Sequence, residues 1–305
     1  MSLLVTGTIG IDTVATPTAH RERILGGSAA YFAAAAGHFA PVRMVAAVGG
    51  DFPADHMAAL RELKNVDLTG LEVRKESKTF AWGGKYFANM NQRETLFTEL
   101  GVLAEPPPKV PHPFADSRYL FLANTHPEVQ LGMLGQVKGR RLTVVDTMDL
   151  WIKIARAELM TLLQQVDGVV LNYEEAEQLT GINSTVAAGK KILSFGPRFV
   201  VVKKGEHGAL LVHRDGLAAL PAFPTDNVVD PTGAGDSFAG GMMGSIAAQG
   251  EIKDPGSFDA IRRAIVFGTV TASFTIESFS LDRLRTLQRP EIMARLDEYT
   301  GMVRV

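Results

Sequence analysis

Short apolar runs and amphipathic segments alternate along the second half of this 305-residue sequence. Runs typical of buried strands lie at 119–122, 142–145, 168–171 and 199–202, and segments with helical spacing lie at 151–163, 174–179 and 186–193. Buried strands separated by helices are typical of a parallel sheet with helices on both faces. We therefore expect an α/β fold in which a mainly parallel sheet lies between two layers of helices.

Three of these runs lead directly to a polar residue. Asp146, Asn172 and Lys203 follow the second, third and fourth run. The carboxyl ends of parallel strands lie at one edge of a sheet, and ligands of such folds bind there. The sequence therefore predicts a binding site at this edge.

The first third of the sequence has a different pattern. Strand-like runs at 3–6 and 43–48 fit the main sheet, whereas 78–87 and 93–100 resemble two strands joined by a polar turn at 89–91. The first of these two is rich in aromatic residues and holds two central glycines, which often mark a bulge or a close approach to a ligand. We interpret this region as a small β-sheet that projects from the main domain; the alternative is an ordinary hairpin of the main sheet.

Composition excludes several classes of function. The chain has 31 Lys and Arg residues against 33 Asp and Glu, a formal net charge of −2, and no cysteine. A nucleic-acid partner needs a dominant basic field, so none is expected. The lack of cysteine excludes disulfides, thiolate zinc sites and cysteine nucleophiles, and it suits the cytoplasm. No apolar run is long enough to cross a bilayer, so no membrane partner is expected.

A glycine-rich turn that opens a helix carries the clearest chemistry. Residues 230–241 read DPTGAGDSFAGG, and an amphipathic run continues to about Ala248. Backbone N–H groups at such a turn, together with the helix dipole, form a binding site for an anion. A carboxylate at Asp236 repels a bound phosphate, but it suits a base that takes a proton from an attacking hydroxyl. The alternative is a structural helix cap in which Asp236 only complements the dipole.

Other site motifs are missing from the sequence. There is no Walker GxxxxGK[ST] pattern and no HExxH pattern, and Phe238 stands where the dinucleotide fingerprint requires a glycine. A dinucleotide-dependent oxidoreductase and a metal hydrolase are therefore disfavoured.

These motifs, taken in order, resemble those of the ribokinase-like (PfkB) carbohydrate kinases. The matching segments, over about residues 3–245, are the strand leading to Asp12, the paired glycines Gly26 and Gly27, VGGD at 48–51, NYEE at 172–175, KKGEHGALL at 203–211 and DPTGAGDSFAGG at 230–241. The resemblance implies a ribokinase-like three-layer αβα sandwich with a mainly parallel sheet and a small β-sheet lid. It implies a single kinase domain over 1–305, with the lid formed by parts of about 11–25 and 78–100.

On the phosphate side, the resemblance makes Asp236 the catalytic base toward the γ-phosphorus of ATP. The N–H groups of Gly233, Ala234 and Gly235 would form the anion hole, where fixed donors lower the barrier. Such kinases use ATP and Mg²⁺, and in several relatives the neighbourhood of the 258–277 helix binds a monovalent cation, so K⁺ is a further expectation.

Asn172 and Glu175 would act on the phosphate and Mg²⁺ side, because a carboxylate suits Mg²⁺. Asn172 with Glu175 is also a helix-capping pair, which is the structural alternative. Lys203 would reach the ATP phosphates; alternatively it is a solvated lysine at the end of a strand. Gly205 and Gly208 would shape the loop beneath the adenine.

On the acceptor side, Asp12 would accept sugar hydroxyls and the glycines Gly26 and Gly27 would let the acceptor lie against the backbone. Tyr31 departs from the Asn that is usual in the family; its ring would stack on a sugar or a base, or simply pack. Lid candidates are Phe80, Trp82, Lys85 and Tyr86. Alternatively, the lid aromatics form a homodimer interface.

The sequence thus predicts an ATP- and Mg²⁺-dependent phosphotransferase that acts on a hydroxyl, typically a primary alcohol, of a small sugar. The first alternative is a nucleoside kinase of the same fold. A second alternative, from a different class, is a non-catalytic nucleotide or sugar sensor; the base and the glycines that such proteins usually lose are kept here.

Overall fold

A nine-stranded sheet forms the centre of the computed structural model, which describes residues 2–304. In spatial order its strands are β13 (Gly216–Leu220), β12 (Ala209–His213), β11 (Phe199–Lys203), β10 (Gly168–Asn172), β9 (Leu142–Asp146), β8 (Tyr119–Leu122), β1 (Leu3–Thr6), β4 (Val42–Gly49) and β5 (Val66–Arg74). From β11 to β5 all neighbours are parallel, and β12 and β13 add an antiparallel edge. The chain begins at β1, fills one side and then returns to β8, so the strand order reverses between β1 and β8.

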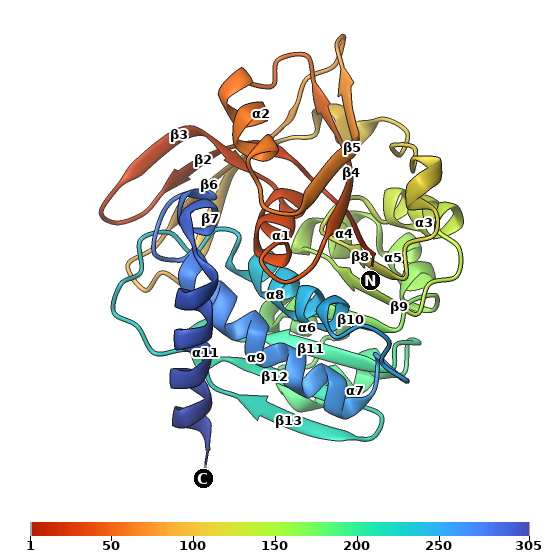
Figure 1. Cartoon of the computed structure of the whole chain (residues 1–305), viewed down its shortest axis with the longest axis vertical. Helices are drawn as coiled ribbons and strands as arrows, with labels where there is room; N and C mark the ends of the chain where they lie inside the picture. The colour runs from red at the N-terminus through yellow and green to blue at the C-terminus, as the bar shows by residue number, and fades with distance from the viewer. Residues whose placement is uncertain (1, 305) are drawn as a thin grey trace.

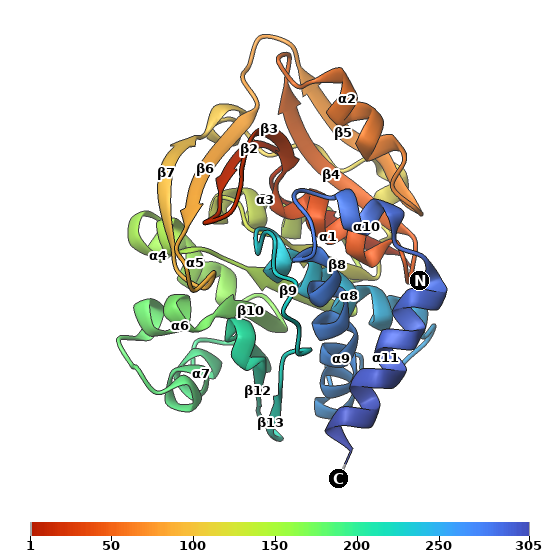
Figure 2. The same cartoon turned by 90° about the vertical axis from the view of Figure 1, so that its left-hand side faces the viewer.

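Helices cover both faces of this sheet (Figures 1 and 2). One layer holds α1 (Ser28–Ala36), α2 (Ala54–Arg61), α8 (Ala234–Ala248), α9 (Phe258–Thr275), α10 (Asp282–Thr286) and α11 (Arg289–Val303); the other holds α3 (Pro127–Gln136), α4 (Asp149–Ile154), α5 (Arg156–Leu163), α6 (Tyr173–Thr180) and α7 (Thr185–Leu193). Strand side chains alternate between the layers: Phe199 and Val201 pack on the first, Val200 and Val202 on the second. The predicted three-layer sandwich is confirmed.

The expected single helix at 151–163 is two helices. α4 and α5 are separated at Ala155, whose backbone (φ −132°, ψ 39°) is not helical. Within residues 2–304, no helix is long and apolar enough to cross a membrane.

A second, four-stranded sheet stands apart from the first. Its order is β3 (His20–Gly26), β2 (Gly10–Ala15), β6 (Phe80–Tyr86) and β7 (Arg93–Glu99), with two antiparallel hairpins joined by the parallel β2–β6 pair. We call it the small sheet. The alternative, a hairpin of the main sheet, is wrong. Its inner face buries four apolar side chains against Phe279: Val14, Phe80, Trp82 and Tyr86.

Glycines allow α8 to pack closely against its neighbours. A Cβ added at Gly240 would lie 2.4 Å from the Phe32 carbonyl oxygen of α1, and one at Gly241 would lie 2.5 Å from the Thr271 hydroxyl of α9. Contacts of this kind need a bare backbone on one side, since real Cβ atoms do not approach so closely. The packing fixes α8 along its length, so its N-terminus has a defined place beside the strand ends.

Candidate active site

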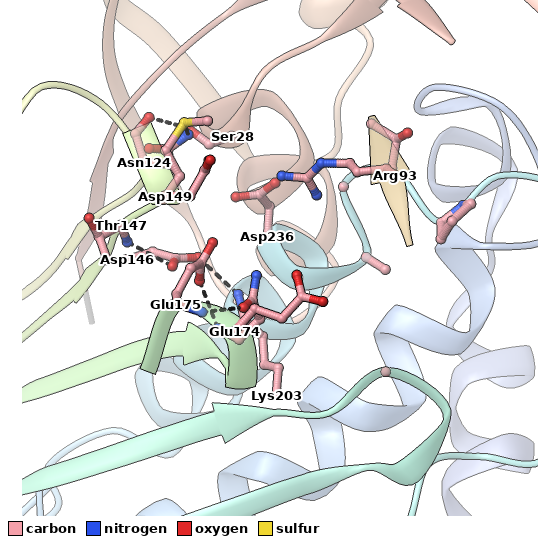
Figure 3. A pocket seen from close by; sticks show the side chains of 18 of the residues that line it. Ser28, Arg93, Asn124, Asp146, Thr147, Asp149, Glu174, Glu175, Lys203 and Asp236 are labelled. Carbon is pink, nitrogen blue, oxygen red and sulfur yellow. Dashed lines mark hydrogen bonds and ion pairs between the residues drawn. The ribbon is translucent and has the colours of Figure 1, made fainter. Parts of the chain in front are cut away.

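A cavity of about 820 Å³ lies at the carboxyl ends of the main-sheet strands (Figure 3). It is bounded by residues that follow β1, β8 and β9, by the ends of β10 and β11, by the N-terminus of α8 and by the inner face of the small sheet. All the residues that the sequence assigned to a site line this cavity, except Gly26, Lys85 and Gly208. The site therefore lies where the strand order reverses, as expected for an open α/β sheet.

The N-terminus of α8 forms the floor of the cavity. Gly233 caps the helix in the left-handed conformation (φ 76°), and the first intrahelical bond runs from the Ser237 N–H to the Gly233 carbonyl (2.9 Å). The N–H groups of Gly233 and Gly235 find no acceptor within the residues that the structure describes, whereas Ala234 donates to Pro231 (3.2 Å). Of the three predicted anion-hole amides, two are thus free to bind a ligand.

Asp236 stands in the first turn of α8, and its carboxylate points into the cavity (Figure 3). Burial raises its pKa to about 7; the carboxylate of Asp146 adds to this rise, and the charges of Lys203 and Arg93 oppose it. A carboxylate with a pKa near neutrality is well suited to accept a proton at physiological pH. This carboxylate therefore has the place and the basicity of a general base.

Lys203 is not solvated, so that interpretation was wrong. Its ammonium group lies 3.1 Å from the Asp146 carboxylate, and the two side chains are only 16% and 5% exposed. Burial lowers the pKa of Lys203, but Asp146 and Glu175 raise it above its ordinary value, which keeps the lysine charged. A Cβ at Gly235 would lie 2.7 Å from the ammonium, so this glycine lets the charge reach the start of α8.

Asn172 and Glu175 cap helix α6 reciprocally. The Asn172 N–H donates to Glu175 (2.7 Å), and the Glu175 N–H donates to the Asn172 side chain (2.8 Å). The structural alternative is therefore present, and both side chains also line the cavity. Burial raises the pKa of Glu175 to about 7, with a further contribution from Asp146.

No three acidic, His or Cys side chains in residues 2–304 are grouped to hold a metal by themselves. Mg²⁺ usually binds through one or two carboxylates, substrate phosphates and water. The buried acids Glu175 and Asp146, beside a helix N-terminus with free amides, fit a Mg²⁺ that arrives with a phosphate ligand.

Asp12 lies at the acceptor side of the cavity and is 4% exposed. One of its carboxylate oxygens has no partner among the described residues, and burial, with Asp230 and Asp236 nearby, raises its pKa from 3.8 to about 8. A Cβ at Gly26 would lie 1.9 Å from the other oxygen. Gly26 therefore makes room for Asp12 rather than for an acceptor, which corrects the predicted role.

Gly27 begins the turn into α1 with a φ of 102°, and a Cβ there would lie 2.5 Å from the Thr8 carbonyl oxygen. Only glycine suits both conditions. Gly27 lines the cavity and places helix α1 against it.

Tyr31 packs rather than stacks. Its ring occupies the space that a side chain at Gly233 would need, because a Cβ there would lie 2.3 Å from the ring. Tyr31 is 1% exposed, and its hydroxyl has no partner within residues 2–304. The tyrosine thus supports the left-handed glycine of the anion hole.

The inner face of the small sheet closes the cavity on the acceptor side. Trp82 lines it, with its ring against Gly84 and the Arg93 guanidinium 5.6 Å from the ring centroid. Lys85, expected on the same surface, is exposed and does not line the cavity.

Hydrogen bonds join the small sheet and its β6–β7 turn to loops of the main domain beside the cavity. The Tyr86 hydroxyl lies 3.2 Å from the Thr232 hydroxyl, just before Gly233, and the Asn91 side chain donates to Glu206 (2.8 Å). Gly205 (φ 56°) lets Asn91 approach, since a Cβ there would lie 2.7 Å from the Asn91 side-chain oxygen. Gly208 (φ 84°) shapes the same loop but lies outside the cavity.

Sequence reasoning did not assign three cavity residues to the transfer site. From the sequence, Asp146 was placed at the end of a strand and residue 93 at the start of another, and Asn124 was not considered. Asp146 is the last residue of β9 and Asn124 follows the neighbouring strand β8, so their place at strand ends was the available signal. No sequence signal placed Arg93 in the site, because the direction of its side chain depends on a bulge in the small sheet.

Comparison with known proteins agrees with this geometry. The family described as pfkB family carbohydrate kinase matches residues 130–285. The cytidine kinase of Thermococcus kodakarensis is 31% identical over 252 residues, which cover 80% of this chain and 87% of the relative. The chain belongs to the pfkB family of carbohydrate kinases, and it is a kinase of the ribokinase type.

Solved structures share the fold. A Burkholderia thailandensis nucleoside kinase in complex with inosine superposes with a TM-score of 0.79 at 20% identity, over 98% of each chain. The aminoimidazole riboside kinase of Salmonella enterica, complexed with aminoimidazole riboside and an ATP analogue, gives a TM-score of 0.74 at 17% identity, over 97% of this chain and 100% of the other. The ribokinase-like fold predicted from the sequence is confirmed.

Replacing Asp12 by Asn should stabilise the protein increasingly as pH rises. The folded carboxyl, with its pKa raised to about 8, stays protonated where the unfolded one ionises, so its contribution to stability is lost between about pH 4 and pH 8. The side-chain amide of the Asp12→Asn variant cannot ionise. Thermal unfolding from pH 5 to pH 8 should show that the melting temperature of the variant exceeds that of the wild type by a margin that grows to several degrees. This margin corresponds to a difference in the free energy of unfolding on the order of a few kcal/mol. A melting-temperature difference that does not change with pH would contradict the raised pKa of Asp12.

The Lys203–Asp146 pair should behave as a buried pair in unfolding experiments. Lys203→Met leaves Asp146 uncompensated and should lower the free energy of unfolding by about 3–5 kcal/mol, and Asp146→Asn in the same chain should recover part of this loss. The exposed pair Lys153–Asp149 (3.1 Å) is the control, since Lys153→Met should change stability by less than about 1 kcal/mol. Equal effects at the two lysines would mean that Lys203 is solvated after all.

Proposed function

We propose that this protein transfers the γ-phosphate of ATP, bound with Mg²⁺, to a primary hydroxyl of a small nucleoside, with Asp236 as the base. One observation carries the proposal: Asp236 lies beside the free amides of Gly233 and Gly235, in the same cavity as the buried acceptor-side carboxyl of Asp12. A proton acceptor, an anion site and a hydroxyl-binding group thus meet in one place.

In this proposal each side chain has a limited task. Asp12 binds an acceptor hydroxyl, and Asp236 takes the proton of the primary hydroxyl as that oxygen bonds to the γ-phosphorus and ADP leaves. The amides of Gly233 and Gly235 and the ammonium of Lys203 face the charge that builds on the transferred group. Asn172 and Glu175 would hold Mg²⁺ through water, and the ion supplies neutralisation of phosphate charge when bound.

Two observations favour a nucleoside over a free sugar. The similar proteins named above include a cytidine kinase and a nucleoside kinase with inosine. The cavity wall on the acceptor side also carries three aromatic side chains of strand β6: Phe80, Trp82 and Tyr86. Aromatic rings bind bases by stacking. A free sugar is the second candidate, favoured by Asp12 and by the family description.

A K⁺ requirement and a homodimer through the small sheet stay predictions. The second is compatible with the apolar side chains that this sheet leaves exposed: Phe87, Leu96 and Phe97 are 46%, 50% and 38% exposed.

Asp236→Asn should lower the turnover number by ~10²–10⁴ and leave ATP binding largely intact, because only proton transfer is lost. Asp226→Asn, an exposed change outside the cavity, is the control. In the wild type, kcat/KM should fall as pH drops below about 7, where the base becomes protonated. Steady-state ADP release measures both effects, and full activity of the Asn variant would sink the mechanism.

Nucleosides should be used with kcat/KM about 10–100-fold above the free sugar, as expected from one base–aromatic stack. Trp82→Ala should remove most of this preference while turnover on the sugar changes little. Phe97→Ala alters an aromatic residue of the neighbouring strand that does not line the cavity and should leave the preference intact. ADP release across ribonucleosides, free sugars and sugar phosphates checks the acceptor class; equal use of ribose and its nucleosides would favour the sugar.

A further inference from the structure

We propose that Arg93, on strand β7 of the small sheet, contacts the phosphoryl group during its transfer and stabilises its charge. The small sheet would then take part in the chemistry as well as cover the acceptor. The inference rests on the proposed function, and it adds a catalytic residue that lies outside the motifs of the main domain.

A bulge in the small sheet directs Arg93 inward. Strands β6 and β7 pair Gly83 with Phe97 but Gly84 with Thr95, so Leu96 is an extra residue on β7. Thr95 and Arg93 therefore share the inner face with Trp82 and line the cavity. Phe97, which follows the bulge in β7, packs against Gly83 and does not line the cavity.

The guanidinium of Arg93 reaches from the small sheet toward the Asp236 carboxylate (Figure 3). It is one of the charges that oppose the burial-driven rise in the pKa of Asp236, and it has the same effect on the pKa of Glu175. The two acids flank the place where the phosphates are proposed to bind, so a cation that influences both lies near that place.

The Arg93 guanidinium has N–H donors that are not used by other side chains within the described residues. Within residues 2–304 it forms no ion pair; its guanidinium lies by the Trp82 ring and the Tyr86 hydroxyl, and the more distant carboxylates of Glu175 and Asp149 raise its pKa. Three lysines also line the cavity: Lys203 is paired with Asp146 and Lys153 with Asp149, each at 3.1 Å, and Lys204 carries an ammonium group without the planar fork of a guanidinium. A guanidinium carries five N–H donors in a planar fork that matches phosphate oxygens. Arg93 is thus a cation of the site that has no ion pair among the described residues and has the geometry to meet a transferred phosphoryl group.

The position of Arg93 depends on the contact between the small sheet and the α8 loop. Arg93 pairs with Tyr86 across β6 and β7, and the Tyr86 hydroxyl bonds to Thr232, next to the anion-hole glycine Gly233. The arginine is therefore set against the anion hole only while the sheet rests on this loop. Such an arrangement ties stabilisation of the transferred charge to closure over the acceptor.

Arg93→Ala tests the inference, with Arg93→Lys as the conservative variant. The alanine variant should lower kcat by ~10²–10³ with acceptor KM changed only a few-fold, and lysine should restore part of the loss. Lys85→Ala is the matched control, because it removes a cation of the same sheet that is exposed and outside the cavity. Its activity and the melting temperatures of all variants should stay near wild type.

Binding of ADP with aluminium fluoride and Mg²⁺ gives a readout that does not need an acceptor. The fluoride complex imitates the transferred phosphoryl group, so Arg93→Ala should weaken its binding at least about tenfold while ADP alone binds as in wild type. An alanine variant with wild-type kcat and undiminished fluoride-complex binding would overturn the inference. A loss confined to acceptor KM would also overturn it, and would assign Arg93 to an anionic group of the acceptor.

These readouts separate the inference from the proposed function. A wild type that releases no ADP with any acceptor, yet binds the fluoride complex through Arg93, would contradict the proposed function and support the role of Arg93. A wild type that turns over nucleosides with no dependence on Arg93 would do the reverse.

Discussion

The close packing of α8 between α1 and α9 is the contact on which the site depends. Bare glycine backbone at positions 240 and 241 lets neighbouring helices approach to distances that a side chain would forbid. Close-packed helices have little freedom to shift, because each movement loses contacts along the whole interface. The helix N-terminus therefore stays in one place, and two free amides and a carboxylate are aimed into the cavity without further reorganisation.

The charges around this helix end form a second constraint. Among the charged residues that line the cavity, the acids Asp146, Glu175 and Asp236 interact with the cations Lys203 and Arg93. Burial raises the pKa of each acid, and the cations keep these shifts moderate. Sites of this kind are held against a cost in stability, which active sites commonly carry. The close packing of the helices beneath these charges offsets that loss of stability.

Patterns local in the sequence predicted the main sheet and the helix N-terminus well. Runs such as 168–171 and 199–202 are buried strands, and the glycine-rich segment before Asp236 opens a helix, as expected. The predictions that were wrong or missing depend on contacts between residues that are distant in the sequence. The sequence left a solvated Lys203 open as an alternative because its partner Asp146 lies 57 residues away on another strand. The role of Gly26 depends on the carboxylate of Asp12, and the direction of Arg93 on a bulge; sequence spacing records neither.

The two halves of the cavity come from different stretches of the chain. The groups proposed to bind the acceptor lie before residue 100, in the small sheet and the turn into α1, whereas those proposed to face the phosphates lie within 130–285, the segment that matches the family. Changes of acceptor preference can therefore accumulate by mutation in the first third of the gene while the transfer machinery is inherited unaltered. Only a few side chains, Arg93 and Tyr86 among them, belong to the first third of the chain and reach the groups of the 130–285 segment. At these positions a change of acceptor has to remain compatible with phosphate transfer.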